Sequence, residues 1–160
     1  MEDVSEDRLI NISNYISNKY LIDGKGPIIQ LRNTQKKGKK LGNINIPHAT
    51  IYSKKNIPQH FHYKTDNLGD YLIVAEPGWM MYSEEDLKDF TIPVEGMHGY
   101  VPSNLNMHGI FYAYGPQFHS GKIINAFELI HIYPLICDIL DIIPSENIDG
   151  DLSVLKNILK

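Results

Sequence analysis

Three short apolar runs in the first half of the chain have the length and composition of β-strands. Residues 28–31 (IIQL) follow the turn-forming sequence DGKGP, and residues 49–52 (ATIY) lie between two proline-containing breaks. Residues 71–75 (YLIVA) form a continuous apolar run that ends at EPG. A run without polar alternation predicts a strand buried on both faces, as in an α/β sheet. The polar segment 32–47 predicts a loop.

The second half of the chain carries one further strand pattern and two helix patterns. Residues 107–114 (MHGIFYAY) are rich in β-formers and end at Gly-Pro, which predicts another buried strand. Residues 134–140 place apolar side chains on one helical face, with a proline in the first turn and another after the end. Three leucines within residues 152–159 predict a short closing helix. Strands followed by a helix indicate part of an α/β sheet, and residues 1–63 predict a more irregular, strand-rich region.

Composition and charge change this picture little. The chain has 160 residues and a net charge of −4, which fits one domain and gives no electrostatic footprint for nucleic acid. The basic run at residues 36–40 (KKGKK) predicts a solvated loop tip. The single cysteine, Cys137, excludes a disulfide within the chain and predicts a small buried hydrophobe. No stretch approaches the ~20 apolar residues of a membrane span, and the acidic beginning of the chain lacks the apolar core of a signal peptide. The compartment is therefore unknown from these residues.

Histidines are the most chemically suggestive residues of the sequence. His60 and His62 are two positions apart, so in a strand they would point the same way, either as a metal pair or as a structural cluster. His108 opens the predicted strand at residues 107–114. His98 has glycines nearby on both sides, in GMHGY, which allow the backbone to approach a bound group closely. Without a C-x-x-C or H-E-x-x-H pattern, the residues indicate an α/β domain with a candidate histidine loop.

Several motifs together resemble one known family. Residues 96–100 (GMHGY) and 107–118 (MHGIFYAYGPQF) resemble the G-x-H-G-Y-D-N and M-x-x-I-F-x-A-x-G-P-x-F patterns of the type I phosphodiesterases/nucleotide pyrophosphatases of the alkaline phosphatase superfamily. Further matches in the family's order lie at residues 57–63, 74–79 and 132–140. A single motif would carry little weight, whereas an ordered set over most of the chain is specific. One departure is Val-Pro after GMHGY, where the family has Asp-Asn.

The resemblance implies a fold, an activity and a cofactor. It implies that residues 1–160 are the C-terminal portion of an alkaline-phosphatase-like α/β sheet, with residues 1–63 as a strand-rich, irregular, insert-like excursion and residues 64–160 as sheet strands and closing helices. It implies a hydrolase that cleaves phosphodiester or pyrophosphate bonds of nucleotides with two zinc ions and a threonine nucleophile. By position in the motif, His98 would be a zinc ligand.

The resemblance also places much of the family's catalytic machinery outside this sequence. Met1 aligns with the methionine that closes the family's S-D-H-G-M segment, so the threonine nucleophile and the other metal ligands would precede it. We therefore expect no catalytic residue in this chain, one zinc ligand, no activity in isolation, and the N-terminal part of the enzyme as partner. Family members are often secreted or membrane-anchored. Two alternatives stay open: a non-catalytic binding or interaction domain derived from the family, and a small metalloprotein that uses several of the histidines.

Overall fold

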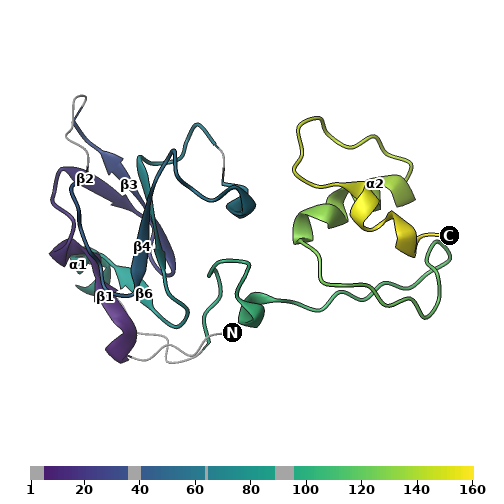
Figure 1. Cartoon of the computed structure of the whole chain (residues 1–160), viewed down its shortest axis with the longest axis horizontal. Helices are drawn as coiled ribbons and strands as arrows, with labels where there is room; N and C mark the ends of the chain where they lie inside the picture. Colours follow the sequence, from purple (N-terminus) through teal and green to yellow (C-terminus); the bar gives the residue numbers. More distant parts are fainter. Residues whose placement is uncertain (1–5, 36–40, 64, 89–95) are drawn as a thin grey trace. The chain divides into compact units, whose positions relative to one another are not determined.

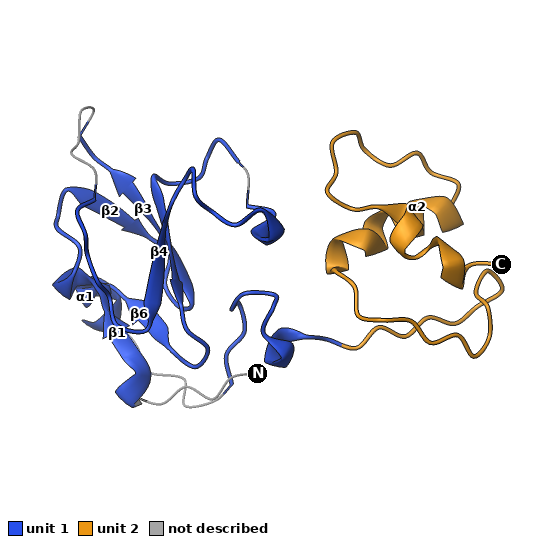
Figure 2. Ribbon diagram, viewed as in Figure 1, with its two compact units in different colours: residues 1–109 blue, residues 110–160 orange. Residues whose placement is uncertain are grey.

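The computed structural model describes residues 6–35, 41–63, 65–88 and 96–160, and the chain divides into two compact units, residues 1–109 and 110–160 (Figure 2). The strands are β1 (Leu9–Asn11), β2 (Tyr20–Asp23), β3 (Ile28–Asn33), β4 (Ala49–Ser53), β5 (Tyr71–Ala75) and β6 (Met80–Tyr82). The α-helices are α1 (Glu84–Lys88) and α2 (Ile132–Ile139). Short 3-10 helices span Glu6–Arg8, Ile12–Asn14, Gln59–Phe61, Leu105–Met107, Leu129–His131, Leu152–Val154 and Lys156–Ile158.

A four-stranded sheet in the order β2-β3-β5-β4 forms the centre of the first unit (Figure 1). β5 lies between β3 and β4 and is antiparallel to both, with Ile73 opposite Ile29 in β3 and Ile51 in β4. Ile73 packs into one hydrophobic cluster, whereas Leu72 and Val74 pack into another on the opposite face. The predicted burial of β5 on both faces is therefore confirmed, although its neighbours are antiparallel strands.

β6 is the strand against which Met97, the neighbour of the candidate ligand His98, packs. It pairs in parallel with β1, with Leu9 opposite Met80. It is also tied to the turn between β2 and β3, because Gly26 N donates to Met81 O at 2.8 Å and Met81 N donates to Gly26 O at 2.9 Å. Gly26 has a φ of 99°, a conformation that a side chain disfavours. This arrangement fixes β6 between two parts of the first unit that are distant in sequence.

The second unit packs helical segments around a small core. Leu135 of α2 is buried against Leu155 and Ile158. Phe111 and Phe127 meet edge to face, with ring centroids 5.0 Å apart and an interplanar angle of 86°. α2 confirms the predicted helix, and the buried Cys137 on it confirms the expected small hydrophobe. The predicted closing helix consists instead of two successive 3-10 turns.

The strand predicted at residues 107–114 is wrong. Met107 ends a 3-10 helix, and residues 108–114 have no assigned secondary structure. The side chains of Ile110, Tyr112 and Tyr114 are exposed, while those of Phe111 and Ala113 are half-buried. This segment keeps the alternation of a strand, but a strand is defined by hydrogen bonds to a neighbour. None of the described residues supplies a backbone partner to residues 109–114.

Other sequence predictions have mixed outcomes. The strands expected at residues 28–31 and 49–52 are confirmed as β3 and β4, while β2, β6 and α1 were not expected. The lysine-rich run at residues 36–40 lies outside the described residues. The expected division into an irregular, insert-like region at residues 1–63 and sheet strands with closing helices at residues 64–160 stays a prediction. In the parts of the chain that the structure describes, no helix is long and apolar enough to cross a membrane.

Candidate functional site

The loop that carries His98 is anchored on both sides of the histidine. Met97 packs against Met80 and Tyr82 of β6, and Tyr100 is buried. His98, between these two anchors, is exposed. The imidazole therefore lies at the surface between two packed neighbours.

Gly99 contributes to the shape of this loop. Its φ of 92° lies in the left-handed region, and a Cβ at this position would lie 3.9 Å from Cγ of Pro27. There is room for a side chain, so the requirement for glycine comes from the backbone conformation alone. Of the two glycines near His98, Gly99 has the left-handed backbone conformation that favours glycine. The role of His98 stays a prediction.

Tyr82 makes the support beneath the loop apolar and uncharged. Burial raises its pKa to about 12, with smaller contributions from Tyr100 and Asp86. The phenol is protonated at neutral pH, as it would be at its ordinary pKa of about 10. Met97 therefore packs against an uncharged side chain.

Asp86, which follows β6 in the sequence, is already used in helix capping. Ser83 Oγ donates to Asp86 Oδ2 at 2.6 Å, Ser83 N donates to the same oxygen at 3.0 Å, and Asp86 N donates to Ser83 Oγ at 3.1 Å. This reciprocal pattern is a capping box at the start of α1. The hydrogen bond from Ser83 is the main cause that lowers the pKa of Asp86.

The described residues do not form a complete metal site. Among residues 6–35, 41–63, 65–88 and 96–160, no group of three or more His, Cys, Asp or Glu side chains can hold a metal ion. Zinc in proteins has about four ligands, and catalytic sites use three from the protein. The exposed imidazole of His98 has the chemistry of one such ligand, but the residues described here do not supply the others. The hypothesis of a small independent metalloprotein therefore gains no support.

The other candidate histidines, His60, His62 and His108, lie in or at the ends of short 3-10 helices. His60 lies in a 3-10 helix with its ring edge to face with Phe61 at 4.8 Å, and His62 ends that helix with a φ of 49°. The segment is a 3-10 turn where a strand was considered, so the strand spacing that would pair these two histidines does not apply. His108 is exposed, and its Nε2 lies 3.2 Å from the carbonyl oxygen of Pro102.

A histidine that the sequence did not single out has the most defined surroundings. His48 Nδ1 lies 2.8 Å from Glu76 Oε2, and the imidazole stacks on Trp79 with centroids 3.8 Å apart and an angle of 4° between the planes. Glu76 N also donates to His48 O at 2.8 Å, which closes the end of the β4–β5 pair. No sequence spacing indicates a contact across 28 positions. We interpret this cluster as a structural contact that holds the adjacent ends of β4 and β5 together.

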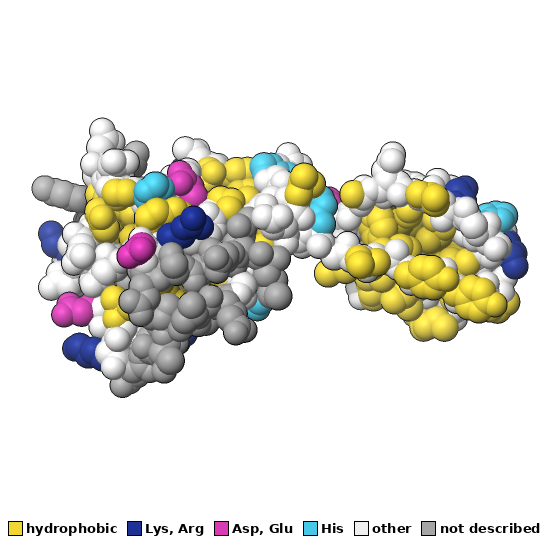
Figure 3. Space-filling view, turned by 90° about the horizontal axis from the view of Figure 1, so that it is seen from below, with side chains coloured by type: hydrophobic (Ala, Val, Ile, Leu, Met, Phe, Trp, Pro, Cys, Tyr) yellow, Lys and Arg dark blue, Asp and Glu magenta, His cyan; other side chains and the backbone are white. Residues whose placement is uncertain are grey.

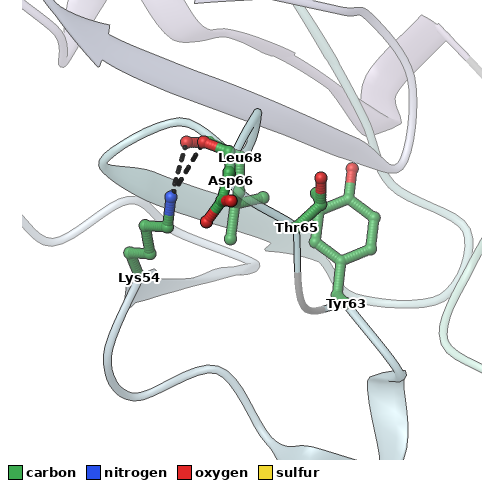
Figure 4. A pocket seen from close by; sticks show the side chains of 5 residues that line it. All are labelled: Lys54, Tyr63, Thr65, Asp66 and Leu68. Carbon is green, nitrogen blue, oxygen red and sulfur yellow. Dashed lines mark hydrogen bonds between the residues drawn. The ribbon is translucent and has the colours of Figure 1, made fainter. Parts of the chain in front are cut away.

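The first unit also has an open hollow of about 430 Å³ lined by Lys54, Tyr63, Thr65, Asp66 and Leu68. Figure 4 shows Lys54 Nζ reaching the backbone of the facing loop, where it donates to the carbonyl oxygens of Asp66 at 3.1 Å and Leu68 at 3.4 Å. Tyr63 accepts a hydrogen bond from Gln30 Nε2 at 2.9 Å. These hydrogen bonds tie the loop to the sheet.

Comparison with known sequences identifies a family. A family model described as type I phosphodiesterase/nucleotide pyrophosphatase matches residues 1–101. Human bis(5'-adenosyl)-triphosphatase is 34% identical over 152 residues, which cover 92% of this chain and 32% of that protein. A venom phosphodiesterase from Crotalus durissus collilineatus is 30% identical over 173 residues, which cover 100% of this chain and 20% of the relative. The chain thus spans a third or less of the length of these two curated relatives.

Solved structures show a similar fold. Human ectonucleotide pyrophosphatase/phosphodiesterase 5 matches with a TM-score of 0.80 and 26% identity, over 99% of this chain and 42% of that chain. An inactive variant of the murine counterpart in complex with AMP matches with a TM-score of 0.82 and 26% identity, over the same shares of each chain. The mixed helix-and-sheet architecture expected from the sequence is confirmed by this match.

Proposed function

The chain belongs to the type I phosphodiesterase/nucleotide pyrophosphatase family, and from that membership we propose that it forms the C-terminal part of a hydrolase of nucleotide phosphodiester or pyrophosphate bonds. The names of the matched relatives support this reaction class, since they are a triphosphatase of bis(5'-adenosyl) substrates and a venom phosphodiesterase. The AMP bound to a structural relative is consistent with a nucleotide substrate. The family resemblance assigns no nucleophile to this chain.

His98 is the residue that we propose to act in this hydrolase, as one ligand of a zinc ion. The support for this role is its exposed position on a loop that Met97 and Tyr100 anchor next to β6. Bound zinc would supply Lewis-acid stabilisation of the charge on the phosphoryl group. This chain's contribution is the position of one neutral imidazole, and the other ligands come from the part of the enzyme that it does not span.

We expect the chain to be inactive in isolation. A single exposed imidazole holds zinc weakly, and a hydrolase of this kind also needs its nucleophile. Purified chain incubated with zinc and a p-nitrophenyl phosphodiester should release no nitrophenol above the rate of buffer with zinc. Turnover by the chain alone that disappears in His98→Ala would contradict the proposal.

The role of His98 is tested in an assembled enzyme. The 160-residue chain is co-expressed with the part of human bis(5'-adenosyl)-triphosphatase that the match does not cover, and phosphodiesterase activity is measured. Replacement of His98 by alanine should lower the activity and the bound zinc, with an activity loss on the order of a hundredfold. His108→Ala, which removes another exposed histidine of the same unit, is the matched control. Equal losses in the two variants would show that His98 has no special role.

The second candidate is a non-catalytic interaction domain, and the exposed apolar side chains of the second unit favour it. This reading predicts that the chain alone is monodisperse and unfolds cooperatively. It also predicts that the co-expressed assembly binds no zinc through His98. Zinc bound to the wild-type assembly and absent from the His98→Ala assembly would exclude it.

A further inference from the structure

The segment 151–160 supplies two of the side chains in the core of the second unit. Leu155 and Ile158 are buried together with Leu135 of α2. Figure 3 shows hydrophobic side chains over much of the face of this unit that it draws. Because hydrophobic packing is not directional, the hydrogen bonds of the segment decide how it is seated on the unit.

The far end of this segment is held by backbone groups. Lys160 N donates to Gln117 O at 2.9 Å, and the backbone amide of His119 donates to Ile158 O at 2.9 Å. Neither the backbone amide nor the backbone carbonyl titrates near neutral pH. The attachment at this end is therefore insensitive to pH in the physiological range.

The start of the segment is held by a titratable side chain. Asp151 N donates to Nδ1 of His131, the residue before α2, at 2.9 Å. The His131 side chain is 12% exposed, so this hydrogen bond is largely shielded from water. The preceding residue, Gly150, lies so close to the carbonyl oxygen of Ile130 that a Cβ would collide with it. The start of the segment thus lies directly against the turn that carries the imidazole.

The direction of this hydrogen bond fixes the state of the imidazole. A backbone N–H can only donate, so Nδ1 of His131 accepts, and the neutral ring carries its proton on Nε2. A protonated ring has a proton on both nitrogens and accepts at neither. The contact between His131 and the amide of Asp151 therefore exists only while the imidazole is neutral.

Carboxylates beside the same imidazole favour its protonated form. Glu128 Oε2 lies 3.9 Å from Nε2 of His131. Hydrogen bonds from Ser153 lower the pKa of the Asp151 carboxyl group, and the charge of His131 lowers it further. The imidazole thus has two sets of partners, a backbone amide when it is neutral and two carboxylates when it is charged.

We propose that His131 is a pH-sensitive latch for the start of the segment 151–160. The neutral ring holds the amide of Asp151, and the protonated ring releases that amide and pairs with the carboxylates of Glu128 and Asp151. The far end of the segment keeps its backbone hydrogen bonds, so the release is local. Imidazole is the side chain that ordinarily changes charge between pH 5 and 8. The latch goes beyond the proposed function and does not depend on it.

Nuclear magnetic resonance of the 160-residue chain tests the latch. At about pH 8 the ring of His131 should carry its proton on Nε2, and the amide of Asp151 should be protected from hydrogen exchange. On acidification to about pH 5.5, the amide proton of Asp151 should shift with the same midpoint as the ring. Its protection, corrected for the intrinsic pH dependence of exchange, should fall at least about tenfold, while Lys160 keeps its protection.

A matched pair of variants assigns the effect to one ring. His131→Asn places an amide oxygen near the position of Nδ1, which accepts a hydrogen bond at any pH, so the amide of Asp151 should stay protected throughout. His119→Asn removes the other histidine of the second unit, whose side chain is exposed, and should leave the transition at Asp151 in place. The titration of the wild-type chain stands by itself if a variant does not fold.

Several results would overturn the proposal. One is a ring of His131 that carries its proton on Nδ1 at high pH, and another is an amide of Asp151 whose protection stays constant while the ring is protonated. An equal loss of protection at Lys160 would also overturn it, because the whole unit would then unfold together. No phosphodiester hydrolysis enters the test, so failure of the latch and failure of the proposed function are separate outcomes.

Discussion

β5 and the segment 110–114 have similar sequences and different structures. Both are five-residue stretches dominated by aromatic, β-branched and small apolar residues, YLIVA and IFYAY. β5 lies between β3 and β4 and buries Ile73 completely. The segment 110–114 has no strand beside it among the described residues, and it exposes Ile110 almost completely. The difference teaches that a strand pattern describes a capacity for pairing, and that the neighbours decide whether it is used.

The two units as wholes repeat this contrast. In the first unit, each face of β5 packs into a hydrophobic cluster. The hydrophobic cluster of the second unit is built around the buried side chains of Leu135, Leu155 and Ile158. A unit with so small a core depends on helix packing and on whatever covers its exposed apolar side chains. The stability of the first unit should therefore be intrinsic, and that of the second should depend more on its surroundings.

The largest difference between the regions is expected from the same substitution at two isoleucines. Ile73→Ala opens a cavity between the sheet and its hydrophobic cluster and should lower the free energy of unfolding by about 2–5 kcal/mol. Ile110→Ala removes an exposed side chain and should change it by about 0.5 kcal/mol or less. Urea denaturation followed by circular dichroism, and by fluorescence of the single Trp79 for the first unit, measures both. Similar losses at the two positions would break the comparison.

A smaller effect is expected at two glycines next to these segments. A Cβ on Gly69 would lie 2.6 Å from the carbonyl oxygen of Leu31 in β3, so Gly69→Ala should force the backbone apart and cost about 1–3 kcal/mol. A Cβ on Gly109 would meet nothing within 4 Å, and Gly109→Ala should be neutral or stabilise by up to about 1 kcal/mol. The same denaturation measurement applies. A destabilised Gly109→Ala would reveal a neighbour beside residues 110–114 that the described structure lacks.

The smallest effect concerns two aspartates that accept hydrogen bonds in the first turns of helices. Hydrogen bonds lower the pKa of Asp86 in the first unit, chiefly from Ser83, and that of Asp151 in the second, chiefly from the backbone of Ser153. Ser83→Ala should cost about 1 kcal/mol at neutral pH and move the pKa of Asp86 toward its ordinary value. The pKa of Asp151 should not move, which carbon-detected NMR titration checks residue by residue.

The pH dependence that follows from Asp86 has a definite sign. Its pKa in the folded chain lies below the unfolded value of about 3.9, so the folded state binds its proton less readily. The stabilisation is therefore present above pH ~4 and is lost as the pH falls through the folded pKa. The Ser83→Ala variant should lose less stability over this acidic range than the wild-type chain. An unchanged acid limb would show that the capping box contributes nothing.

Much of the fold could be predicted because its signals are local. The turn DGKGP before β3, the apolar run of β5 and the proline-flanked α2 each follow from backbone preferences and periodicity within a few residues. The short strands β2 and β6 escaped prediction because they owe their assignment to partners elsewhere, as Met81 does to Gly26.

The candidate site was likewise predicted in part from local sequence features and in part revealed by tertiary contacts. The sequence alone singled out His98, because glycines beside a histidine are visible locally and the motif order placed it in a family. The structure added that Met97 and Tyr100 anchor its loop, since Met97 is partly buried against Met80 and Tyr82 of β6 and Tyr100 is buried. The pairing of His48 with Glu76 and Trp79 is a tertiary contact between the ends of two strands, and no local pattern announces it.

The sequence by itself determined the family, the central strands, the helix α2 and the histidine of the candidate metal loop, because each is written in residues close together or in a fixed order. Only the tertiary structure decided that IFYAY, whose composition is similar to that of the buried strand YLIVA, is exposed and has no backbone hydrogen-bond partner among the described residues. The physical reason is that a strand is stabilised by hydrogen bonds and side-chain contacts with its neighbours, and those neighbours are supplied by distant parts of the fold.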